Sequence, residues 1–264
     1  LTIGEVLDLV LQIFKATVVR GLPYGICIMI AARLSNIYDL GSDAVRQPFG
    51  GDRPIWWALS VVGALLVLIA WSALLLQQRA IIEHTPTTIK SELAEALRRL
   101  PSLLPATLLF FVIAGGEFAV LLLVPQQYRH GTRIPLVVLS SYLAILLSCT
   151  WPAVLLAGQR PVGAVRQSVR LVWGNWWRVS ITYAVGAAAV LVLGVLVGIL
   201  IALVVPTLVA DIPVMMAVFT VVANAMGAVV APFAGALLLA VFGDLRVRKE
   251  GIDLQQRIVG LAVD

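Results

Sequence analysis

The residue whose type and position could most readily do chemistry is Glu117, the one acid well inside a long apolar run. It lies seven residues from the nearer end of that run, about 10 Å deep at about 1.5 Å per residue. A charge at that depth is costly, so the carboxylate is a candidate for binding a proton or holding a cationic ligand. The alternative is a protonated carboxyl that hydrogen-bonds to another helix, through Ser140, Tyr142 or Asn224.

A second candidate site combines tryptophan and arginine side chains beside the fifth apolar run. Tryptophan rings favour the boundary between membrane and water, so they are expected to be interface anchors. The alternative is a site for a lipid headgroup, formed together with the arginines. The residues are Arg166, Arg170, Trp173, Trp176, Trp177 and Arg178. In the sixth run, Asn224 is expected to hydrogen-bond between helices rather than to bind a ligand.

Basic residues also follow the sixth apolar run directly, at Arg246, Arg248 and Lys249. Such a cluster favours the anionic inner leaflet of a membrane. We expect the tail to close over the interfacial helices, with Glu250, Asp253 and Gln255 available as partners. Recognition of a cytoplasmic protein partner is the alternative.

Catalytic and metal-binding signatures are missing from the sequence. There is no H-E-x-x-H, no glycine loop that could hold a phosphate and no nucleophile elbow. The predicted topology places His84 and His130 on opposite sides of the membrane. Cys27 and Cys149 lie in apolar runs and are expected to pack rather than to form a disulfide or bind metal. We therefore expect no enzyme, no cofactor and no metal.

Composition indicates a membrane protein. The chain is 61% hydrophobic and only 12% charged, against about 25% charged residues in soluble domains. The net charge is +5, but the basic residues lie at the ends of apolar runs and form no single patch. Nucleic acid is therefore not an expected partner.

Six apolar runs are long enough to cross a membrane as helices. They cover residues 18–37, 55–77, 103–124, 134–157, 180–205 and 214–242. With the N-terminus inside, inner segments hold 14 of the 19 lysines and arginines and outer loops hold 5. This bias predicts that both termini are cytoplasmic. The chain starts at Leu1, so we expect the initiator upstream, and acids in the first helix pattern argue against a signal peptide.

An amphipathic pattern precedes each pair of spans, starting near Ile3, Ile89 and Val162. The apolar positions share one register, Val6/Leu93/Val165, with acids such as Glu92 on the polar face of the second copy. A Thr2–Glu5 capping box starts the first copy, Thr85-Pro86 the second and Pro161 the third. The pattern predicts one all-α membrane domain over 1–264, built from three parallel repeats (1–84, 85–160 and 161–243) and a cytoplasmic tail, 244–264.

Small residues form stripes on the last two spans. The sixth has Ala223, Gly227, Ala231 and Gly235 at four-residue spacing, and the fifth has Gly186, Gly194, Gly198 and Ala202. Such stripes allow close helix packing, so we expect these two spans to pack together, or one of them to form a homo-oligomer. Proline predicts a kink in the fourth span at Pro152 and in the sixth at Pro232.

Two segments carry a resemblance to a known family. Residues 242–254 read FGDLRVRKEGIDL, and residues 164–178 read AVRQSVRLVWGNWWR. Together with the opening LTIGEVL, they resemble the bacterial glycerophosphoryl diester phosphodiesterase membrane-domain family. The resemblance implies six spans in a bacterial inner membrane. It implies no defined chemistry, because the phosphodiesterase reaction belongs to a soluble barrel with metal-binding acids and histidines that no stretch here could form.

Three functions follow as hypotheses. The first is a non-enzymatic membrane protein that binds phospholipids or partner proteins and has an accessory role in envelope upkeep. The second is a small transporter with a central cavity that uses Glu117. The third, ranked last, is an intramembrane enzyme or its accessory subunit.

Overall fold

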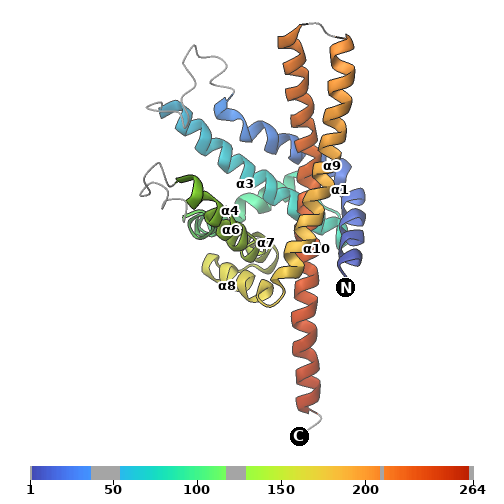
Figure 1. Ribbon diagram of the computed structural model, residues 1–264. Coiled ribbons are helices and arrows are strands. Elements are labelled where there is room, and N and C mark those ends of the chain that lie inside the picture. The colour runs from blue at the N-terminus through green and yellow to red at the C-terminus, as the bar shows by residue number, and fades with distance from the viewer. Residues whose placement is uncertain (1, 37–53, 117–128, 209–210, 262–264) are drawn as a thin grey trace. The chain divides into compact units, whose positions relative to one another are not determined.

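The computed structural model describes residues 2–36, 54–116, 129–208 and 211–261, and within these ranges it is helical with no β-strand (Figure 1). The helices are α1 (Ile3–Ala32), α3 (Pro54–Ile82), α4 (Ile89–Gly115), α6 (Arg129–Leu146), α7 (Thr150–Ala157), α8 (Pro161–Val172), α9 (Trp176–Leu208) and α10 (Ile212–Leu261).

Six helical segments in the described residues are long and apolar enough to cross a membrane. They are Ile3–Ala32, Pro54–Ile82, Ile89–Gly115, Arg133–Ala157, Trp176–Pro206 and Val214–Lys249. Each contains most or all of the described part of one predicted apolar run. The prediction of an all-α polytopic membrane protein with six spans is therefore confirmed.

The helix starts show which capping predictions are correct. Glu5 accepts a hydrogen bond from the Thr2 backbone N–H while Thr2 Oγ1 accepts one from the Glu5 N–H, so the capping box is confirmed. Pro161 takes the first position of α8, as expected. The predicted start at Thr85-Pro86 is wrong. There, Thr88 and Ser91 cap each other reciprocally, so α4 begins at Ile89.

The amphipathic patterns take different forms in the three places. In α1 and α4 the pattern runs into the span without a break, and only α8 is a separate helix. The buried faces differ as well. Val6 and Val10 are buried in the first copy, whereas in the second Leu93 is exposed and Glu92 is buried. The threefold repeat therefore stays a prediction.

The described helices group into two compact units, each assembled from separate stretches of the chain. Unit 1 comprises Leu1–Val10, Arg98–Val185 and Leu237–Asp264, and unit 2 comprises Leu11–Leu97 and Gly186–Ala236. These boundaries cut across the predicted repeats.

In unit 1 the fourth predicted span is broken rather than only kinked. α6 ends at Leu146 and α7 begins at Thr150. Pro152 lacks an N–H and cannot donate to the carbonyl of Ser148 four residues earlier, which favours a break just before it. The Ser168 hydroxyl of α8 donates to the Leu146 carbonyl (2.8 Å) and accepts from the Cys149 N–H (3.1 Å). This buried serine therefore satisfies both sides of the break and fixes α8 against α6 and α7.

In unit 2 the small residues of α10 meet α1 and α3. A Cβ on Gly227 would lie 2.1 Å from Met29 Sδ of α1, and one on Gly235 would lie 2.5 Å from Gln78 Oε1 of α3. The prediction that the last two spans pack together through their small-residue stripes is therefore wrong for Gly227 and Gly235 of α10. In α9, a Cβ on Gly194 would lie 3.8 Å from Met226 Cε of α10, and one on Gly198 would meet nothing within 4 Å.

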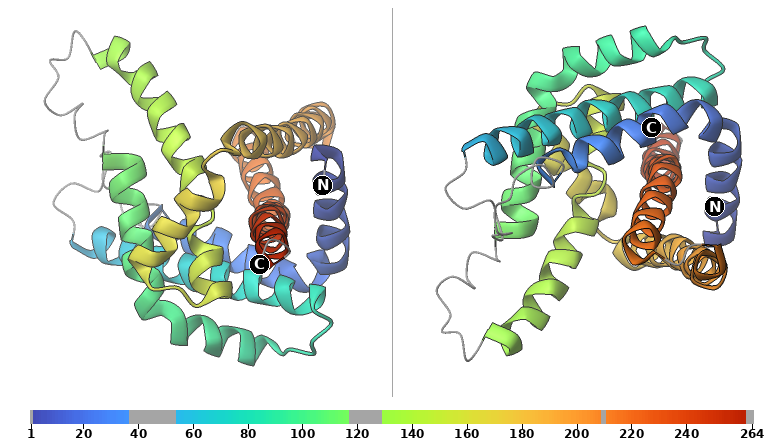
Figure 2. Two further views of the ribbon diagram at one scale, coloured as in Figure 1. Left: turned by 90° about the horizontal axis from the view of Figure 1, so that it is seen from below. Right: turned by 90° about the horizontal axis from the view of Figure 1, so that it is seen from above.

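In unit 2, α1 and α10 approach each other closely. A Cβ on Gly25 would lie 2.0 Å from the backbone oxygen of Ala228, so the two backbones are almost in contact. One turn earlier, Gly21 faces Pro232 and Leu74. Gly21 and Gly25 have the four-residue spacing of a small-residue packing motif, which is not among the stripes predicted from the sequence. Figure 2 shows the later part of α1 running beside α3, where Gly63 faces the Ala31 carbonyl.

Candidate functional site

The residues predicted to contact lipid headgroups lie in unit 1, on α8 and on the described parts of α9 and α10 that follow. α8 ends at Val172, and Gly174 takes a positive φ of 86° that turns the chain into α9. Arg166 and Arg170 are four residues apart, on one face of α8, and both are exposed. Their guanidinium groups are thus presented together.

Two of the three tryptophans beside these arginines are exposed. Trp173 is 63% exposed and Trp177 is 74% exposed. Such large apolar rings at the start of a candidate span are typical of anchors at the membrane boundary. We call Arg166, Arg170, Trp173 and Trp177 the α8 surface.

Trp176 has a different environment from its neighbours. Its ring packs against that of Tyr142 with centroids 5.0 Å apart, and its indole N–H donates to the Tyr142 carbonyl at 3.4 Å. Trp176 therefore joins α9 to α6, and the predicted cluster of three tryptophans separates into one packing residue and two exposed ones.

Arg178 and Arg248 share one buried acid, Asp244. The Arg178 Nε lies 3.3 Å from Asp244 Oδ2, and the Arg248 Nε lies 3.2 Å from the same oxygen. Asp244 is 7% exposed. Two of the basic residues predicted to contact lipid or a partner are thus held by an internal carboxylate, which joins α9 to α10.

Asp244 is not among the residues predicted from the sequence. Glu250, Asp253 and Gln255 are the predicted partners of the basic tail, but the side chains of these three lie outside what the structure describes. The four-residue spacing between Asp244 and Arg248 on one helix was the available signal. Arg246 is exposed and Lys249 half-buried. The predicted tail continues α10 as far as Leu261.

The structure does not support a binding site at the two intramembrane candidates, Glu117 and Asn224, within the residues that it describes. Glu117 lies outside the described residues. One of its predicted partners, Ser140, donates its hydroxyl to the Ala114 carbonyl. Asn224 donates its amide to the Thr220 carbonyl at 2.9 Å, a bond within α10 rather than between helices. Within the described ranges, no group of three or more His, Cys, Asp or Glu side chains is placed to hold a metal ion.

The fold and these surfaces define a multi-pass α-helical membrane protein. No protein-family model, no curated protein and no solved structure matches this chain.

Proposed function

We propose that the chain is a non-enzymatic protein of the bacterial inner membrane that binds anionic phospholipids through the α8 surface. Its role is accessory, in upkeep of the membrane or envelope. The observation that carries the proposal is the exposed pair Arg166 and Arg170, followed closely in the chain by the exposed Trp173 and Trp177. Arginine recognises phosphate oxygens, and tryptophan favours the depth at which headgroups lie.

The basic residues differ in their environments, and this difference supports the proposal. Arg178 and Arg248 both pair with Asp244, and the pair with Arg178 joins α9 to α10. Arg166 and Arg170 are on the exposed face of α8, opposite the face that buries Ala164 and Ser168. The charge bias of the loops predicts that this surface is cytoplasmic, where anionic lipids are found.

The family resemblance is compatible with the same proposal. Its segments contain Ser168, which bridges the break between α6 and α7, and the ion pair of Arg178 with Asp244. These motif residues thus stabilise the packing of helices in unit 1. We propose membership of the membrane-domain family on this basis. The alternative function, a transporter using Glu117, stays a prediction from the sequence.

The test is lipid binding by the variant Arg166→Gln/Arg170→Gln. A basic residue near an anionic surface contributes about 1 kcal/mol, so losing two should weaken phosphatidylglycerol binding about 30-fold. Native mass spectrometry of the purified full chain, titrated with phosphatidylglycerol, measures this change.

The matched control is Lys15→Gln/Arg33→Gln, which removes two exposed charges outside the α8 surface. It should retain wild-type binding of phosphatidylglycerol, and phosphatidylcholine should bind all three proteins equally. If the Arg166/Arg170 variant binds phosphatidylglycerol as tightly as the wild type, the proposed function is wrong.

A further inference from the structure

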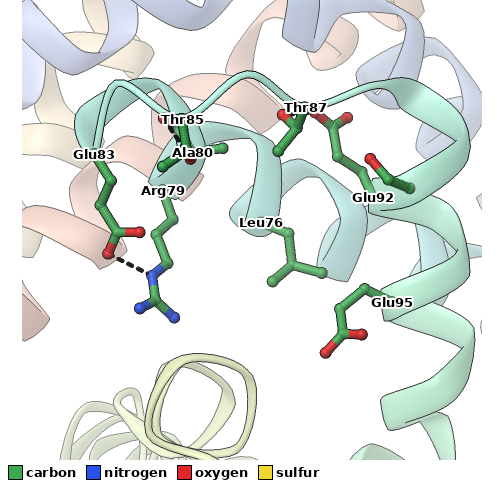
Figure 3. A pocket seen from close by; sticks show the side chains of 9 residues that line it. Leu76, Arg79, Ala80, Glu83, Thr85, Thr87, Glu92 and Glu95 are labelled. Carbon is green, nitrogen blue, oxygen red and sulfur yellow. Dashed lines mark hydrogen bonds and ion pairs between the residues drawn. The ribbon is translucent and has the colours of Figure 1, made fainter.

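A pocket of about 340 Å³ lies in unit 2, beside the segment that connects α3 to α4. Figure 3 shows Arg79 and Glu83 on one side of it and Glu92 and Glu95 on the other, with Leu76 between them. The hydroxyl side chains of the connecting segment and of Ser91 complete the lining. The volume falls within the range of about 300–1,000 Å³ that is usual for small-ligand pockets.

The charge of this lining is opposite to that of the whole chain. The chain has a net charge of +5, yet the lining contains three carboxylates and one guanidinium. That guanidinium, of Arg79, forms an ion pair with Glu83 at 2.7 Å. The lining therefore contains more carboxylates than guanidinium groups, and Glu92 is the buried one among them.

Glu92 is the unusual member, because it is only 3% exposed. Tyr24 donates its hydroxyl to Glu92 Oε2, and Thr87 donates its hydroxyl to Glu92 Oε1 at 2.7 Å. Both donors are neutral. The nearby Arg20 donates instead to the Thr87 carbonyl, at 2.9 Å. Among the residues that the structure describes, no lysine or arginine forms an ion pair with Glu92.

A buried carboxylate normally has a cation beside it, since desolvation of an unpaired charge is strongly unfavourable. Each Glu92 oxygen accepts one hydrogen bond and retains a lone pair. The pocket offers room for the missing cation, and Glu95 supplies a second carboxylate on the same helix, three residues further on. An alkylammonium group has three donors and matches this set of acceptors.

We propose that this pocket binds the primary ammonium group of an aminophospholipid headgroup, with Glu92 as its counter-ion. The pocket lies where two candidate spans, Pro54–Ile82 and Ile89–Gly115, end and begin, which is the depth of the headgroups. Arg79 faces the same space and can contact the phosphate, and Leu76 forms an apolar wall. The site uses residues other than those of the α8 surface and needs no anionic lipid.

The test compares Glu92→Gln and Glu95→Gln with the wild-type chain in nanodiscs of phosphatidylethanolamine and phosphatidylcholine. Native mass spectrometry measures how much of each lipid stays bound. The wild type should retain phosphatidylethanolamine in preference to phosphatidylcholine. Each variant should lose this preference by about tenfold or more, because a hydrogen bond to a charged group is removed. If the Glu92→Gln variant fails to fold because its substitution is buried, the Glu95→Gln variant alone tests the proposal.

Asp8→Asn is the matched control, since it removes an exposed carboxylate outside the pocket; it should retain the preference. Unchanged preference in Glu95→Gln and in a folded Glu92→Gln would overturn the proposal. Displacement of the lipid by millimolar ethanolamine would overturn the lipid as the source of the ammonium group. Phosphatidylglycerol binding through Arg166 and Arg170 is measured separately, so either proposal can fail without the other.

Discussion

At the scale of single residues, Asp244 shows how a motif of charged residues can be structural. Its carboxylate is buried and accepts from Arg178 and Arg248, which belong to different helices. Breaking a buried ion pair by removing one partner is usually destabilising by about 3–5 kcal/mol. Here the arginine side chains are 23% and 34% exposed, so water can replace part of what is lost.

Asp244→Asn should therefore lower the free energy of unfolding by about 1–3 kcal/mol. Equilibrium unfolding of the purified chain in detergent and SDS measures it. The control is Glu83→Gln, which removes a 48% exposed carboxylate from its ion pair with Arg79, four residues earlier in the chain, and should change stability by about 0–1 kcal/mol. Equal effects of the two substitutions would show that Asp244 does not join α9 to α10.

The burial of Glu92 could not be predicted from the sequence. The helical period places it on the polar face of an amphipathic segment, and that assignment predicts a solvated side chain. The structure buries it against Tyr24 of another helix. Periodicity describes one helix at a time, so it cannot show that a second helix brings a hydroxyl over the same face.

At the scale of elements, the small-residue stripes illustrate the same limit. The spacing of Gly227 and Gly235 correctly marks a face that packs closely, but spacing contains nothing about which helix fills it. The structure places α1 and α3 there. Spans, in contrast, were predictable, because length and apolar composition alone decide whether a helix can cross a bilayer. The break between α6 and α7 was not, since its hydrogen bonds come from Ser168 on α8.

Gly25→Ala tests the packing of α1 against α10. The added methyl group would lie 2.0 Å from the Ala228 backbone oxygen, so the helices must separate. We expect a loss of about 1–3 kcal/mol in the free energy of unfolding, as for other overpacked sites. SDS unfolding measures it.

Gly198→Ala in α9 is the matched control, because its added methyl group meets nothing within 4 Å. It should be neutral or slightly stabilising, since alanine is favoured over glycine in helices by about 1 kcal/mol. If both variants unfold at the same SDS concentration, the close approach of α1 and α10 does not contribute to stability.

At the scale of the whole molecule, the number of spans and the charge bias together predict the sidedness of every surface discussed above. Arg166 of α8 and Asp211 before α10 are separated by one candidate span, Trp176–Pro206. They must then lie on opposite sides of the membrane. The predicted topology places 14 of the 19 lysines and arginines on the same side of the membrane as the N-terminus. Arg166 is therefore expected in the cytoplasm and Asp211 outside.

Single cysteines at these two exposed positions test the arrangement, in a chain whose Cys27 and Cys149 are replaced by alanine. A membrane-impermeant maleimide should label Asp211→Cys from outside in spheroplasts, and Arg166→Cys only in inverted membrane vesicles. The cysteine-free chain controls for background labelling. The reverse pattern would put the α8 surface outside and remove the cytoplasmic anionic leaflet from the proposed function. Labelling of both positions from one side would mean that α9 does not cross the membrane, because a single crossing between them forces the two sites apart.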